Sequence, residues 1–123
     1  RHTTVLRPGE ILTSVRLPAT WANATFYFEK VADRNAWDFA LVSIAAAMRE
    51  SGGVIQDARF VAGAVQCTPR RLLDVESAVR GQPRTEATAQ SLGTLASQGA
   101  QPLNHNGFKL HLVDSLAKRA LLG

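Results

Sequence analysis

Residues 28–48, with the sequence FEKVADRNAWDFALVSIAAAM, decide the fold of this 123-residue chain. The second half of this stretch is ambiguous. Three consecutive alanines, residues 45–47, favour a helix, whereas Val42, Ile44 and the following Gly52-Gly53 pair fit a strand that leads into a hairpin turn. Propensity alone divides these two interpretations evenly.

The segments around this stretch have strand patterns. Residues 11–17 alternate apolar and polar side chains between Pro8-Gly9 and Pro18, which is typical of a half-buried strand. Residues 25–31 alternate as well and place Phe26, Phe28 and Lys30 on one face. Residues 54–65 supply an antiparallel partner, so the pattern predicts a sheet of three or four strands within residues 11–67.

The remainder of the chain has helical spacing and predicts three helices between residues 69 and 122. The first begins at Pro69 with Thr68 as its cap and stops at Gly81, and the second spans residues 85–98. The third follows Asn106-Gly107 and carries the strongest apolar stripe of the sequence: Leu112, Val113, Leu116, Ala117, Ala120 and Leu121. Strands followed by helices indicate a single α+β domain over residues 1–123, with one face of the sheet covered.

Composition excludes several functions. The 14 Lys and Arg against 10 Asp and Glu give a net charge of +4, but the basic residues are scattered, whereas a nucleic-acid surface clusters them. The chain has no apolar run of the roughly 20 residues that a membrane span requires. No Cys cluster or His spacing predicts an iron–sulfur or metal site, and no glycine-rich loop between a strand and a helix predicts a pyrophosphate site.

Several segments, taken in order, resemble the C-terminal domain of the flavin-carrying subunit of molybdenum hydroxylases, the xanthine dehydrogenase and carbon monoxide dehydrogenase group. They are LRPGEILTSVRLP at residues 6–18, the quoted stretch with Lys30, Arg34 and Asp38 spaced four apart, the strand at Gly63, Thr68-Pro69-Arg70-Arg71, and NGFK at residues 106–109. Within the group, the flavin subunits of three-subunit aldehyde or xanthine oxidoreductases look most similar. The resemblance implies a helical turn near Asp38 and then a strand, and we therefore expect residues 41–49 to be a strand.

The resemblance also implies which residues lie near FAD. A lysine at the place of Lys30 contacts the flavin ring in the family, where its charge would favour the negatively charged reduced form; the alternative is a lysine that extends along the apolar face to solvent. Leu12 matches a position that touches the flavin through its backbone, and the alternative is a core leucine. Trp37 matches a segment that approaches the flavin face, and the alternative is a core or interface tryptophan. Arg34 and Asp38 have the spacing of a local ion pair if the backbone coils there.

The resemblance implies a domain of a larger redox enzyme. The main flavin-binding loops belong to a domain that precedes this one, and the opening RHTT, without an initiator Met, agrees with a piece of a longer protein. FAD would be bound in the full-length subunit, whereas molybdenum cofactor and iron–sulfur clusters would belong to partner subunits. The expected complex is soluble and cytoplasmic, with periplasmic export of the whole complex as the alternative. The competing function is an assembly domain without flavin contact.

Overall fold

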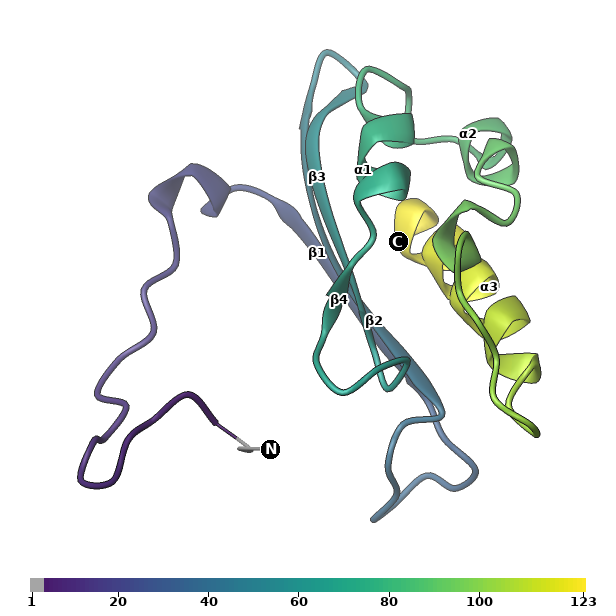
Figure 1. Ribbon diagram of the computed structural model, residues 1–123. Coiled ribbons are helices and arrows are strands. Elements are labelled where there is room, and N and C mark those ends of the chain that lie inside the picture. Colours follow the sequence, from purple (N-terminus) through teal and green to yellow (C-terminus); the bar gives the residue numbers. More distant parts are fainter. Residues whose placement is uncertain (1–3) are drawn as a thin grey trace.

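The computed structural model describes residues 4–123, which form a four-stranded antiparallel sheet with helices packed on one face (Figure 1). The strands β1 (Thr25–Val31), β2 (Val42–Ser51), β3 (Val54–Gly63) and β4 (Arg70–Arg71) lie in this order across the sheet. The ambiguous alanine run is therefore a strand. Gly52 and Gly53 both have positive φ (61° and 78°), which lets two residues join β2 to β3.

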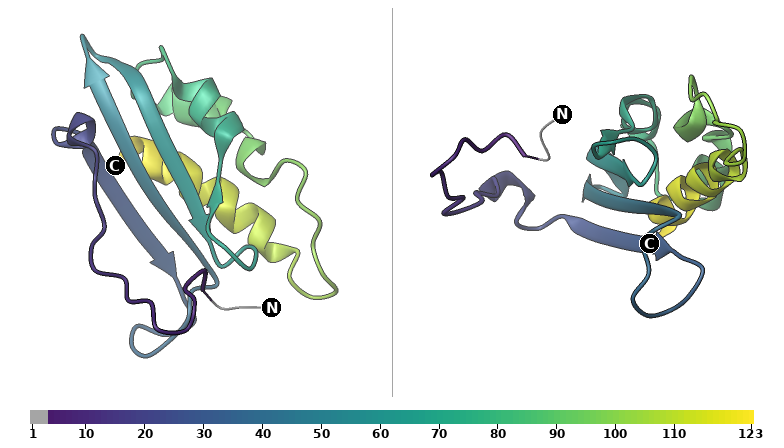
Figure 2. Two further views of the ribbon diagram at one scale, coloured as in Figure 1. Left: turned by 60° about the vertical axis from the view of Figure 1, so that its left-hand side comes forward. Right: turned by 60° about the horizontal axis from the view of Figure 1, so that its bottom comes forward.

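The helices are α1 (Leu73–Val79), α2 (Glu86–Ser91) and α3 (Phe108–Leu122), with short 3-10 turns η1 (Ala19–Trp21) and η2 (Leu95–Ser97). Figure 2 shows α3 running across one face of the sheet, whereas the segment before β1 lies on the other side. The expected α+β sandwich, with one face of the sheet covered by three helices, is confirmed.

The core lies between the sheet and the helices. Alternate residues of β2 and β3, among them Ile44, Met48 and Phe60, are fully buried against the inward side chains of α1 and α3. Small residues such as Ala46, Ala62 and Ala117 belong to the same cluster and let α3 approach the sheet closely. The apolar stripe predicted for α3 faces this core as expected, with Leu112 partly buried at its margin.

One buried carboxylate joins α1 to the sheet. Glu76 is only 3% exposed, and its Oε1 accepts hydrogen bonds from the Phe60 backbone N–H (3.0 Å) and from Arg71 Nε (2.6 Å). Arg71 Nη2 also donates to the other carboxylate oxygen, so the pair is bidentate. The hydrogen bond with Glu76 raises the pKa of Arg71, in spite of the opposing effect of desolvation.

The strand expected at residues 11–17 is wrong. Within residues 4–123 this segment has no strand partner, and its apolar side chains are exposed on both sides of the chain: Ile11 (83%), Leu12 (66%), Val15 (75%) and Leu17 (82%). Alternation shows that a segment suits a sheet but does not supply a neighbouring strand. The fourth strand is instead β4, whose Arg70 and Arg71 pair with Ala62 and Val61.

Two helix boundaries also differ from the expectation. Residues 70–71 are extended because they pair with β3, so α1 begins at Leu73 and not at Pro69. The helix predicted for residues 85–98 is divided into α2 and η2 at Gly93, whose φ of +53° lies in the left-handed region. Thr85 does cap α2, with its hydroxyl accepting the Thr88 N–H at 3.3 Å, and the third helix begins where it was expected.

Candidate functional site

The face of the sheet that the helices leave open carries exposed aromatic side chains. Because the strand alternates, Tyr27, Glu29 and Val31 of β1 point toward the helices, and Phe26, Phe28 and Lys30 point the other way. Phe26 and Phe28 are 65% and 70% exposed. A row of small or short side chains continues this face into β2 and β3, because Phe28 lies opposite Ala45 and Ala45 opposite Val61.

Lys30 lies at the end of β1, and the residues next to it across the sheet have short side chains or none. Its partner across β2 is Ser43, and Ser43 in turn lies opposite Gly63. A Cβ atom at position 63 would lie too close to Ser43 Oγ, so a larger residue would fit there only if this hydroxyl turned away. Short side chains therefore lie beside Lys30, whose exposed ammonium donates to the Asp38 carbonyl oxygen at 3.0 Å.

The connection between β1 and β2 is organised by Asp38. Its Oδ2 accepts the backbone N–H groups of Asp33 (3.0 Å) and Arg34 (3.2 Å). The Arg34 guanidinium points elsewhere and donates to the Trp37 carbonyl oxygen at 2.8 Å. The expected side-chain ion pair between Arg34 and Asp38 is therefore replaced by these bonds, because the segment bends here and does not form the helical turn that would align the two side chains.

The same connection presents two aromatic side chains to solvent. Trp37 is 96% exposed and has a φ of +52°, uncommon for a residue with a side chain, and Phe39 is 94% exposed. The alternative of a core tryptophan is wrong for Trp37 within this domain. Phe39 is a residue that sequence reasoning missed, although its apolar character within a polar, bending segment was the available signal.

The segment before β1 meets the sheet at Trp21. The guanidinium carbons of Arg49 and Arg59 lie over the Trp21 ring, 5.6 and 5.0 Å from its centre, which is cation–π geometry. Arg49 Nη1 also donates to the Thr20 carbonyl oxygen at 3.3 Å. Sequence reasoning missed this clamp, although the β2–β3 register brings Arg49 and Arg59 to neighbouring positions of one face.

Beyond the clamp, Leu12 does not approach Lys30. It belongs to the extended segment before β1, which stands away from the sheet in Figure 1 and in the right-hand view of Figure 2, and no hydrogen bond of the described residues joins it to the β1–β2 connection. The alternative of a core leucine is wrong here, because Leu12 is 66% exposed. The structure thus brings Lys30, Trp37 and Asp38 together and leaves Leu12 apart.

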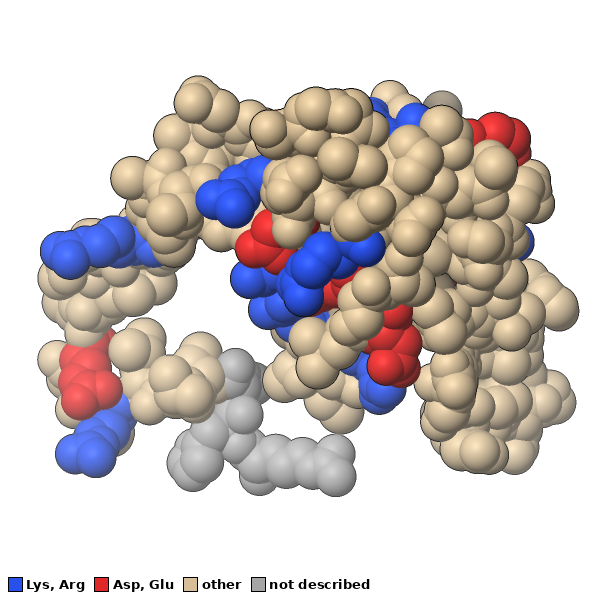
Figure 3. All heavy atoms as spheres, turned by 90° about the horizontal axis from the view of Figure 1, so that it is seen from above, with Lys and Arg blue, Asp and Glu red and all other residues tan. Residues whose placement is uncertain are grey.

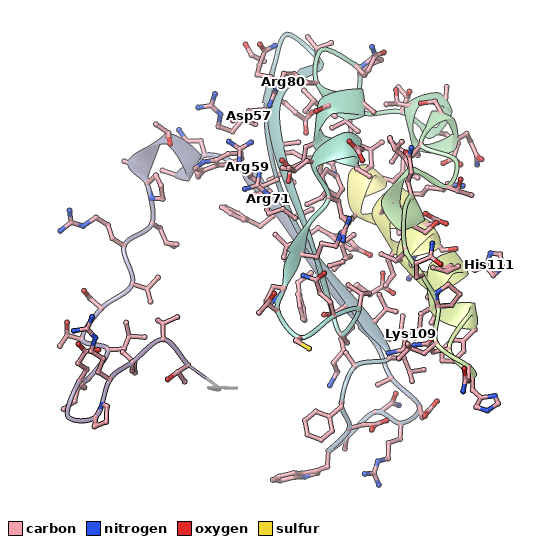
Figure 4. The ribbon with its side chains drawn as sticks, viewed as in Figure 1. Asp57, Arg59, Arg71, Arg80, Lys109 and His111 are labelled. Atoms are coloured by element: carbon pink, nitrogen blue, oxygen red, sulfur yellow. The ribbon has the colours of Figure 1, made fainter. Side chains whose placement is uncertain are left out.

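Charged side chains continue from the clamp along β3. Asp57 Oδ1 accepts hydrogen bonds from Arg59 (2.6 Å) and Arg80 (3.2 Å), and these three residues lie close together in Figure 4. Burial alone would raise the pKa of Asp57, but the two arginines outweigh it and lower this pKa. Figure 3 shows basic and acidic side chains gathered side by side on this side of the molecule, which indicates an ion-pair network and not a uniformly basic surface.

The described residues contain no group of three or more His, Cys, Asp or Glu arranged to hold a metal ion. None of the helices in residues 4–123 has the length and apolar character to cross a membrane. Cys67 lies in the exposed bend between β3 and β4.

Comparison with known proteins identifies the family of this chain. The model of the CO dehydrogenase flavoprotein C-terminal domain matches residues 27–123, so the chain belongs to this family. It is 31% identical over 122 residues to the glyceraldehyde dehydrogenase medium chain of Sulfolobus acidocaldarius and 35% identical over 118 residues to the aldehyde oxidoreductase FAD-binding subunit PaoB of Escherichia coli. Each match covers 96% of this chain, but only 43% and 32% of those relatives' lengths.

Solved structures show the same fold. Quinoline 2-oxidoreductase from Pseudomonas putida matches with a TM-score of 0.73 and 27% identity, and carbon monoxide dehydrogenase from Hydrogenophaga pseudoflava with 0.72 and 27%. Both matches cover 81% of this chain and 36% of the other chain. The expected resemblance to flavin subunits is confirmed at the level of the domain family.

Proposed function

We propose that this chain is the C-terminal domain of the FAD subunit of a molybdenum-containing hydroxylase or dehydrogenase of the xanthine or aldehyde type. The family and the two curated relatives support this assignment, and the short coverage of those relatives supports a larger flavin-binding domain elsewhere in the full-length subunit. The observation that carries the proposal is the sheet face that none of the three helices covers. On this face the exposed ammonium of Lys30 lies beside exposed aromatic side chains and short side chains.

The residues of this face fit one end of a flavin ring. Phe28, Ala45 and Ser43 share this face with Lys30, and an exposed aromatic ring beside short side chains would suit a planar ligand. Residues 4–123 carry no glycine-rich loop between a strand and a helix that would hold the pyrophosphate, so the remainder of FAD would be bound by the larger domain. When bound, FAD supplies the transfer of electrons between a two-electron substrate reaction and one-electron carriers.

Lys30 is the residue that would tune this chemistry. Its ammonium donates a hydrogen bond to the Asp38 carbonyl at the edge of the open face, and the Asp38 carboxylate accepts two backbone N–H groups. An ammonium held next to the pyrimidine end of the ring would favour negative charge there. Trp37, on the same connection, would cover the ring or control access to it, and Leu12 would contact the ring through its backbone once the segment before β1 is packed in the full-length subunit.

The remainder of the proposed complex follows the same assignment. A molybdenum-cofactor subunit and an iron–sulfur subunit would be the partners, and electrons would reach the flavin through the iron–sulfur clusters. The exposed apolar side chains of residues 5–17 and of β1 supply apolar surface for packing within the subunit and against these partners.

The test is Lys30→Met in the full-length subunit. Methionine keeps an unbranched stem beside Phe28 but removes the charge, so the fold and FAD content should persist while the two-electron flavin potential falls. A fall of about 30 mV, equal to roughly 1.4 kcal/mol for two electrons, is the expected size for one partly screened charge. Spectroelectrochemical titration measures this potential.

Lys118→Met is the matched control, because Lys118 belongs to α3 on the covered face of the sheet and should leave the potential unchanged. An unchanged potential in Lys30→Met with full FAD occupancy would contradict the flavin contact. The domain would then have the competing function of assembly alone.

A further inference from the structure

A cavity separates η2 and the start of α3 from the far ends of β3 and β4, away from the open face. Its volume is about 280 Å³, close to the lower end of small-ligand sites. Its apolar lining includes the buried core residues Ala62, Leu72 and Val113, so the floor of the cavity is the edge of the core itself. Residues 96–101 form one wall.

The charged residues that line this cavity are all basic. They are Arg70 of β4 and Lys109 of α3, and no Asp or Glu is among the lining residues. Figure 4 places Lys109 at the beginning of α3, where the helix dipole adds positive potential. The side-chain amides of Gln66, Gln98, Gln101 and Asn106 provide further hydrogen-bond donors.

Arg70 and the adjacent Arg71 differ in the partners of their guanidinium groups. Arg71 is bonded to Glu76, whereas Arg70 makes no side-chain hydrogen bond or ion pair within residues 4–123. Lys109 Nζ is engaged by the Ala64 carbonyl oxygen at 3.0 Å, a neutral acceptor that leaves its charge uncompensated. Two carboxylates lie near the cavity but do not line it. Asp114 accepts hydrogen bonds from the Ser97 backbone N–H (2.9 Å) and hydroxyl (2.7 Å), and Asp74 lines a smaller adjoining cavity. The positive charge of Arg70 and Lys109, reduced by these two nearby carboxylates, suits an anion with a single negative charge.

We propose that this cavity binds a carboxylate carried on a short apolar stem. The planar fork of Arg70 would bind the carboxylate, which matches its geometry, and the stem would lie on Ala62, Leu72 and Val113. The carboxylate has two sources: a free aliphatic acid, or a carboxylate of another protein chain such as a C-terminus. Both sources share the chemistry that the cavity presents.

The test is a heteronuclear NMR titration of the 123-residue chain with two probes. Hexanoate represents the free acid, and acetyl-Gly-Leu with a free C-terminus represents the protein carboxylate. At least one acid should shift the amide signals of residues 96–101 and 109–113, with a dissociation constant on the order of 1 mM for so small a ligand. Arg70→Gln should weaken that binding about tenfold or more.

Matched controls separate charge from apolar binding. Hexanamide and the amidated peptide should shift these signals much less, and Arg16→Gln, which removes an exposed charge outside the cavity, should leave the affinity unchanged. Arg70 is exposed and unbonded, so its variant should retain the dispersed spectrum of the folded chain. Binding of hexanoate identifies a free acid, and binding of the peptide alone identifies a protein carboxylate. The proposal is overturned if neither acid shifts these signals, if the amides bind equally well, or if Arg70→Gln binds as tightly.

Discussion

The two faces of the sheet are built by the same strands, but one face is buried and the other is exposed. On the helical side, Ile44, Met48 and Phe60 are fully buried, whereas Phe26 and Phe28 on the other side are more than half exposed. The sequence alternation that assigns these residues to opposite faces is equally regular on both. A regular strand pattern therefore defines two faces but does not tell which one is covered within the chain.

The open face carries features that would be costly in a core. Lys30, Arg49 and Arg59 place three cations among its apolar side chains, and burying them without partners would be unfavourable. Each instead has a polar or aromatic partner at the surface: a carbonyl for Lys30, Trp21 for both arginines, and Asp57 for Arg59. The helical face stabilises the fold, and the open face is available for the rest of the proposed flavin site.

The largest expected contrast between the faces is the truncation of one phenylalanine on each. Phe60→Ala removes a fully buried ring and should lower the free energy of unfolding by about 3–5 kcal/mol. Phe28→Ala removes a ring that is 70% exposed and should change it by less than about 1 kcal/mol. Urea denaturation of the 123-residue chain measures both, and similar losses would mean that the open face is covered in solution.

The second contrast compares adjacent arginines of β4. Arg71→Ala leaves the buried Glu76 carboxylate without its charged partner, whereas Arg70→Ala removes a side chain that is unbonded within the described residues. Because the Arg71 side chain is 44% exposed, we expect a loss of about 2 kcal/mol, below the 3–5 kcal/mol of a fully buried pair. Arg70→Ala should cost less than about 0.5 kcal/mol. Chemical denaturation at neutral pH measures the free energy of unfolding of both variants. Equal losses of this free energy would contradict the role of Glu76 in joining α1 to the sheet.

The sequence predicts those parts of the molecule that depend on local patterns. The apolar stripe of α3 is such a pattern, whereas local propensity left the β2 segment evenly divided between helix and strand, and the family resemblance favoured the strand. The expected strand at residues 11–17 is wrong because alternation of side chains does not show whether a neighbouring strand is present. The two-residue β4 displaced the predicted start of α1, since its pairing with β3 is a tertiary contact without a local signal.

The candidate site was predictable to a similar extent. The position of Lys30 on the aromatic face follows from strand alternation, and its suggested role came from family resemblance. The bonds of Asp38 to backbone N–H groups, and the clamp of Trp21 by two arginines, depend on the path of connections that have no periodic pattern. Such contacts between irregular segments and strands are what sequence periodicity does not describe.

A smaller effect is the pH dependence of stability that the ion pairs of Asp57 should cause. The pKa of Asp57 is lowered in the folded protein, so its ion pairs contribute stability above the ordinary pKa of 3.8. That contribution is lost as the pH falls through the lower folded pKa. The difference in unfolding free energy between the wild type and Asp57→Asn should therefore shrink between about pH 6 and about pH 2.5. A difference that stays constant over this pH range would contradict the contribution of the Asp57 ion pairs.

The smallest effect concerns the two tryptophans of the chain, which lie in different environments. Trp21 is half-buried under Arg49 and Arg59, whereas Trp37 is 96% exposed. Each can be observed alone, Trp21 in Trp37→Phe and Trp37 in Trp21→Phe. Acrylamide, a neutral quencher, should quench Trp37 more strongly. Trp21→Phe should also cost about 0.5–1 kcal/mol of stability through the weakened cation–π contacts, and Trp37→Phe should cost almost nothing.

Removing the arginines tests whether the clamp itself protects Trp21. In the Trp37→Phe background, Arg59→Met should raise the quenching of Trp21 toward that of Trp37, because the nearer guanidinium no longer covers the ring. Arg80→Met is the matched control, since Arg80 pairs with Asp57 but does not lie over the ring. Equal quenching of the two tryptophans before any arginine is changed would show that the segment before β1 leaves the sheet in solution. Trp21 would then not fix the start of the segment that carries Leu12, and the approach of Leu12 to the flavin would have to come from the remainder of the subunit.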